Sequence, residues 1–70
     1  MSEMTLTVNG TPEQHDAPTV ADLLGAKGLD AGRKGIAVAL NGAVVPRRAW
    51  AETALSGGDT VEIIEAKQGG

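Results

Sequence analysis

Apolar and polar residues alternate at the start of the chain in a way that predicts a β-hairpin. Residues 4–8 read Met-Thr-Leu-Thr-Val, so the apolar side chains would face one side of a sheet and the threonines the other. Asn9-Gly10 follows, a pair that tolerates the positive φ angles of a tight hairpin turn. Residues 11–15 are polar and contain Pro12, which predicts a return strand at the edge of the sheet.

A second strand pair is predicted in the middle of the chain. Residues 36–40 alternate Ile, Val and Leu with alanines, and Asn41-Gly42 supplies another tight turn. Val44 and Val45 begin the return strand. Pro46 ends it, because proline has no backbone N–H to donate to the ladder.

Residues 19–28 interrupt the strand pattern and predict one main helix. Thr19 is suited to cap its N-terminus, and Asp22 stands three residues later, in the position of a capping box. The apolar side chains recur at helical spacing, at Val20, Leu23 and Leu24. Gly28 suits the C-terminal end of the helix, and Leu29 should pack back on the core.

A short helical turn and a last strand complete the expected order. Residues 47–55 predict the short helix and a connector, with Trp50 covering one end of the core. After a turn at 56–59, the last strand carries Val61, Ile63 and Ile64. The order β-β-α-β-β-short helix-β is that of the ubiquitin-like β-grasp, an α+β fold with one main helix packed across a mixed sheet. In that fold the first and last strands pair in parallel at the centre.

The length of 70 residues allows one domain, near the size at which a core alone gives marginal stability. The sequence has no cysteine, so neither disulfides nor thiolate metal sites contribute. The 41% apolar residues, mostly aliphatic, must therefore supply the core. We assign residues 1–66 to the β-grasp domain and 67–70 to a flexible C-terminal tail.

Charge and composition exclude several classes of function. A net charge of −3 argues against nucleic acid or an anionic membrane as the main partner. No stretch has membrane-spanning length, and the first ten residues lack the features of a signal peptide, so we expect a cytoplasmic location. The one histidine, His15, lies in the polar strand predicted at 11–15, and the sequence offers no cysteine nucleophile for it to activate, which argues against catalysis. A single histidine with scattered carboxylates has no metal-ligand spacing, which argues against metal binding.

The sequence closes with Gly69-Gly70, which has two interpretations. Small residues tolerate fraying at a terminus. Alternatively, a bare glycine carboxylate on a flexible stalk can be threaded into another protein's active site. Glycine suits that use because a narrow channel admits its backbone and no Cβ shields the carbonyl from attack.

Two places where the pattern breaks are candidate docking sites for a partner. Val61 and Ile63 take the inward positions of the last strand, which sends Ile64 to the opposite face. An exposed Ile64 would extend an apolar surface patch; alternatively, a neighbouring strand or a bulge covers it. Arg47 and Arg48 could meet acidic groups on a partner, or form an ordinary solvated surface.

Three stretches together carry a family resemblance: "AVALNGAVVPRRAW" at 37–50, "GDTVEII" at 58–64 and the final Gly69-Gly70. They resemble the ThiS family, the bacterial sulfur carriers of thiamine biosynthesis. The hydrophobic strand, the Asn turn, Val-Pro-Arg and the Trp four residues after the Pro form a specific match, and the resemblance covers essentially the whole chain.

The resemblance implies a chemistry in which Gly70 is the reacting residue. A ThiF-like activating enzyme would use ATP and magnesium to adenylate the Gly70 carboxylate, and a persulfide sulfur donor would displace AMP to give a thiocarboxylate. A ThiG-like thiazole synthase would then take the sulfur. The chain would be a carrier with no catalytic residue and no bound cofactor, and Gly69 would be needed for the tail to enter the active site.

Two other functions remain open at this point. One is a sister carrier resembling the small subunit of molybdopterin synthase, which uses the same thiocarboxylate chemistry on a different enzyme. The stretch "VPRRAW" favours the thiamine branch. The other is a ubiquitin-like protein modifier or interaction module, in which the Gly-Gly end is joined to lysine or stays unmodified.

Overall fold

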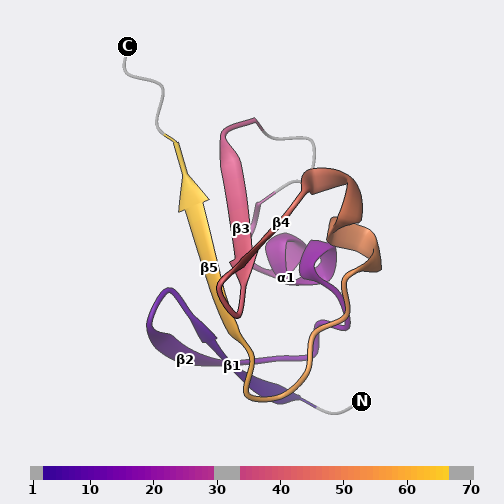
Figure 1. Ribbon diagram of the computed structural model, residues 1–70. Helices are drawn as coiled ribbons and strands as arrows, with labels where there is room; N and C mark the ends of the chain where they lie inside the picture. The colour runs from indigo at the N-terminus through magenta and orange to yellow at the C-terminus, as the bar shows by residue number, and fades with distance from the viewer. Residues whose placement is uncertain (1–2, 30–33, 67–70) are drawn as a thin grey trace.

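The strands form one mixed sheet, and the main helix packs across it (Figure 1). The computed structural model describes residues 3–29 and 34–66. Its elements, in chain order, are β1 (Met4–Val8), β2 (Thr11–His15), α1 (Val20–Ala26), β3 (Ile36–Leu40), β4 (Ala43–Val45), the 3-10 helix η1 (Arg47–Glu52) and β5 (Thr60–Glu65). This confirms the predicted order of elements.

The sheet of the described residues has five strands in the order β2-β1-β5-β3-β4, so the last strand lies at its centre. β1 and β5 run parallel, with Thr7 opposite Thr60 and Val8 opposite Val61. All the other pairings are antiparallel: β1 with β2, β3 with β4, and β3 with β5. The prediction of a central parallel pair is confirmed, and so is the placement of β2 at an edge.

Helix α1 has the predicted signals at both ends. The Thr19 hydroxyl oxygen accepts a hydrogen bond from the Asp22 backbone N–H at 3.2 Å, and the hydroxyl donates to the Asp22 carboxylate at 2.9 Å. At the other end, Gly28 has a φ of 78° and donates to the Gly25 carbonyl, while Leu29 donates to the Leu24 carbonyl. This is a Schellman motif, and it turns Leu29 back into the core as predicted.

The core lies between the sheet and the two helices. Its largest fully buried side chains come from β1, α1, β3, η1 and β5: Trp50, Leu6, Leu23, Leu24, Val8, Val20, Val38 and Val61. Trp50 is buried, and its indole N–H donates to the Val45 carbonyl at 2.9 Å, which satisfies its one polar atom. The predicted role of Trp50 in the core is confirmed.

β5 continues past the end of β1 towards the end of the chain (Figure 1). It is described as far as Ala66, which follows the strand. The predicted tail at 67–70 lies outside the described residues, so its flexibility and the domain boundary before it stay predictions.

Candidate functional site

The end of β5 is fixed on the β3 side as far as the structure describes it. Ile36 lies opposite Glu65 in the antiparallel ladder. One residue further on, the Ala66 N–H donates to the Gly35 carbonyl at 2.6 Å. Gly69 and Gly70 lie outside the described residues. Ala66 is the last described residue before them, so the described part of the site ends there.

Glycine is required at position 35 by two features. Its φ is 82°, in the left-handed region that L side chains rarely adopt. A Cβ placed there would lie 3.0 Å from the Ala66 carbonyl oxygen. Gly35 thus permits the close approach of the two backbones that holds Ala66 at the end of the central strand.

The side chain of Asn9 extends the β1 side of the β5 ladder. Its Oδ1 accepts from the Ile63 N–H at 2.7 Å, and its Nδ2 donates to the Ile63 carbonyl at 3.1 Å. β1 itself ends at Val8, opposite Val61, and the Asn9 N–H donates to the Val61 carbonyl. The amide therefore takes the place of a further strand residue beside β5.

Asn41, from the second hairpin turn, bonds the start of β5 in a similar way. Its Oδ1 accepts from the Thr60 N–H at 2.9 Å, and its backbone N–H donates to the Thr60 carbonyl at 2.7 Å. Its Nδ2 also donates to Asp59 at 3.0 Å. The sequence predicts both Asn-Gly pairs only as turns. The contacts to β5 could have been suspected because a side-chain amide offers a donor and an acceptor together, and can bond both the N–H and the carbonyl of a strand residue.

Ile64 lies on the solvent side of the sheet. It is 64% exposed and Val44 is 77% exposed, so the alternative that Ile64 is covered is wrong. Across the sheet, Ile64 lies opposite Ala37, and Ala39 lies opposite Val44, so the four share one face. We call Ile64, Ala37, Ala39 and Val44 the outer patch. Because the alanines of β3 are small, they leave the larger side chains on either side of them uncovered.

Arg47 and Arg48 are exposed at the start of η1. The Arg47 guanidinium carbon lies 4.7 Å from the centroid of the Trp50 ring, in a cation–π contact. The two arginines are therefore not an ordinary solvated pair, because the Arg47 side chain covers the buried indole of Trp50. Arg48 is exposed at the surface.

His15 belongs to a small charged cluster on β2 and α1. Its Nε2 lies 2.7 Å from Glu13 Oε1, and the Lys27 ammonium contacts both Glu13 oxygens at 2.9 and 3.0 Å. The hydrogen bond from His15, followed by that from Lys27, lowers the pKa of Glu13. The cluster joins β2 to the end of α1. In the described part of the chain, no group of acidic, histidine or cysteine side chains could hold a metal ion.

The fold and its central strand define the structural class: this is a ubiquitin-like β-grasp protein in which β5 leads towards the Gly-Gly end. The family model described as the ThiS family matches residues 4–70. The chain belongs to the ThiS family. No curated protein matches it.

Two solved structures resemble the chain over almost its whole length. One is a crystal structure of the thiamine biosynthesis protein ThiS from Geobacter metallireducens, 38% identical, with a TM-score of 0.78; the match covers 96% of this chain and all of that one. The other is an NMR solution structure of a thiamine biosynthesis protein from the same organism, 36% identical, with a TM-score of 0.76; it covers 96% of this chain and 88% of that one.

Family membership establishes the general role of the protein. It is a small sulfur carrier of thiamine biosynthesis, and it interacts with enzymes of that pathway. The thiamine branch is thereby favoured over the molybdopterin synthase subunit. None of the described helices is long and apolar enough to cross a membrane.

Proposed function

We propose that the protein carries sulfur as a thiocarboxylate on Gly70. A carboxylate oxygen of Gly70 attacks the α-phosphorus of ATP in a ThiF-like activating enzyme, and pyrophosphate leaves. The terminal sulfur of a persulfide donor then attacks the acyl carbon, and AMP leaves. A thiol reduces the resulting acyl disulfide, which frees the thiocarboxylate. A ThiG-like thiazole synthase accepts its sulfur.

The observation that carries this proposal is the link between the central strand and the Gly-Gly residues. β5 is bonded along its β3 side up to Ala66, and the family model matches the chain through Gly70. Four residues separate the fixed strand from the reacting carboxylate. When extended, they span at most about 14 Å. An activating enzyme can thus receive the carboxylate in a narrow channel while the β-grasp body stays outside.

The chain supplies the acyl group, and the partner enzymes supply the catalysis. ATP and magnesium belong to the activating enzyme, and we propose that this chain binds no cofactor of its own. Gly69 gives the backbone the freedom and narrowness needed in the channel. Because the reaction consumes ATP and supplies a biosynthetic enzyme, we also propose a cytoplasmic location.

We propose that the outer patch and the two arginines dock on these partners. Ile64 lies two residues before Ala66, on the exposed face of the same strand. Contiguous exposed apolar side chains often mark binding surfaces. A partner that receives the tail must lie beside the end of β5, where it can cover Ile64. Arg47 and Arg48 would contact the rim of that interface.

A pair of glycine substitutions tests the role of Gly70. In Gly70→Ala the new Cβ crowds the reacting carbonyl, so pyrophosphate release by the cognate activating enzyme should fall at least about tenfold. Gly57→Ala is the matched control, because its Cβ meets only the Met4 Cβ at an ordinary 3.6 Å and its φ is not positive. Equal rates for the two variants would argue against Gly70 as the acceptor.

A further inference from the structure

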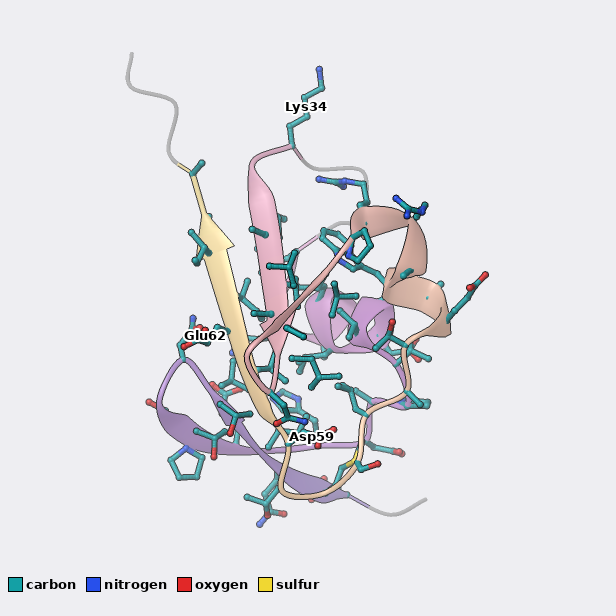
Figure 2. The ribbon with its side chains drawn as sticks, viewed as in Figure 1. Lys34, Asp59 and Glu62 are labelled. Atoms are coloured by element: carbon teal, nitrogen blue, oxygen red, sulfur yellow. The ribbon has the colours of Figure 1, made fainter. Side chains whose placement is uncertain are left out.

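Basic side chains gather at the end of the sheet where β5 finishes. Lys34 directly precedes Gly35, whose carbonyl bonds Ala66, and Figure 2 shows Lys34 projecting beyond this end. β4 and β5 both run towards this end: β4 stops at Val45, opposite Val38, and β5 continues to Glu65, opposite Ile36. The two arginines that open η1 follow β4 after one residue. We call Lys34, Arg47 and Arg48 the basic end.

Among the described residues, Lys34 and Arg48 differ from Lys27 in their ion pairing. Lys27 forms its ion pair with Glu13. Within the described residues no ion pair engages Lys34 or Arg48, and both are exposed. Glu65 is the acidic residue at the same end of β5. Among the described residues, Lys34 and Arg48 therefore contribute exposed positive charge near the end of β5.

The opposite end of the sheet is acidic. β1 is parallel to β5 and antiparallel to β2, so the start of β1 and the end of β2 lie away from the finish of β5. Three carboxylates occupy this region: Glu3, Asp16 and Asp59. Figure 2 shows Asp59 and Lys34 at opposite ends of the molecule. Among the described residues, Lys34 and the two arginines thus lie towards the end of β5, and these three carboxylates lie towards the opposite end.

We propose that the basic end docks on acidic side chains around the mouth of the channel that receives the tail in the activating enzyme. This inference rests on the proposed function. A positive end on a negatively charged protein is attracted to an acidic surface while the rest of the molecule is repelled from it, so encounters are oriented tail first. The outer patch then supplies the short-range apolar contact.

The test measures the KM and kcat of adenylation by the cognate activating enzyme as salt is raised. Lys34→Gln and Arg48→Gln each remove one positive charge from the basic end. Arg47 is left unchanged because its guanidinium packs on Trp50. Gln14→Glu is the matched control: it changes the net charge by the same amount at an exposed site on β2, opposite Thr5 near the start of β1.

We expect each removed cation to raise KM about threefold at low salt and the double variant about tenfold, because rim charges act mainly on association. The kcat should stay within about twofold, and the KM difference should shrink near ~0.5 M salt as the charges are screened. Gln14→Glu should leave KM near the unsubstituted value. Lys34→Arg should retain it too, since the charge is kept.

Two results would overturn the inference: a double variant with unchanged KM, or a Gln14→Glu control with the same increase. An increase that salt does not reduce would also contradict an electrostatic docking. The failure of the proposed function looks different, because then the unsubstituted protein gains no adenylate or sulfur at all. Thermal melting of each variant confirms that the folded state is being compared.

Discussion

The side-chain amide of Asn9 bonds both backbone groups of Ile63, with Oδ1 2.7 Å from the nitrogen and Nδ2 3.1 Å from the carbonyl oxygen. The two residues lie 54 positions apart in the chain. Through this pair of bonds, the first hairpin turn supports β5 beyond the point where β1 ends. A turn residue thus contributes to the position of the strand from which the tail departs.

Replacing Asn9 with glycine should destabilise the protein by about 1–3 kcal/mol, because the partly buried N–H and carbonyl of Ile63 lose their partners. Glycine keeps the positive φ of 52° without strain, so the loss reports the amide alone. Denaturant unfolding measures it. Asn9→Asp keeps an acceptor for the Ile63 N–H, so its unfolding free energy should lie between those of the unsubstituted protein and Asn9→Gly. An unchanged unfolding free energy in Asn9→Gly would contradict the role of the amide.

Gly35→Ala should loosen the end of β5, whereas Gly10→Ala should not. The two glycines have nearly equal φ angles, 82° and 83°, so both substitutions introduce backbone strain of about 1–3 kcal/mol. Only at position 35 would the new Cβ also lie 3.0 Å from the Ala66 carbonyl oxygen. Hydrogen exchange at the Ala66 amide separates the effects: it should accelerate more in Gly35→Ala, and equal acceleration would contradict the proposed contact.

Truncating the two neighbouring isoleucines of β5 should have very different effects on the free energy of unfolding. Ile63 is 7% exposed and packs in the core, so Ile63→Ala should cost about 2–5 kcal/mol of stability. Ile64 is on the outer face, so Ile64→Ala should change stability by no more than about 0.5 kcal/mol. If the outer patch docks on the activating enzyme, Ile64→Ala should instead raise KM. A stable variant with normal kinetics would remove Ile64 from the interface.

The Glu13 cluster should make stability depend on pH in the acidic range. His15 and Lys27 hold the pKa of Glu13 below its ordinary value of 4.5 in the folded state. The stabilisation is therefore fully present above the unfolded pKa and is lost as the pH falls through the lower, folded value. The difference in unfolding free energy between the protein and Glu13→Gln should shrink accordingly on acidification. A difference that stays constant across this range would contradict the assignment.

Local patterns were enough to predict the elements of the fold. Alternation at 4–8 and 36–40, and the capping signals at Thr19 and Gly28, act between residues close in the chain, and the structure confirms each of them. The parallel pairing of β1 with β5 followed from the order of elements. For η1 the sequence predicts a short helical turn but not its 3-10 geometry.

The contacts that shape the site could not be predicted, because they join distant segments. The bonds of Asn9 and Asn41 to β5 depend on the register of the assembled sheet. The exposure of Ile64 depends on which side chain β3 places opposite it, and that residue is the small Ala37. Lys34 and the arginines of η1 likewise lie towards the same end of the sheet only because of the strand pairing.

Mass spectrometry of the C-terminal fragment tests the central claim most directly. The protein is incubated with ATP, magnesium, its cognate activating enzyme, a persulfide donor and a thiol, then cleaved after Trp50. Sulfur for oxygen adds nearly the same mass as methionine oxidation, but residues 51–70 contain neither Met nor Trp. We predict that this fragment gains the shift, and that the gain disappears without ATP or when Gly70 is removed. A plain carboxylate after incubation with a demonstrably active enzyme would contradict the sulfur-carrying role of Gly70.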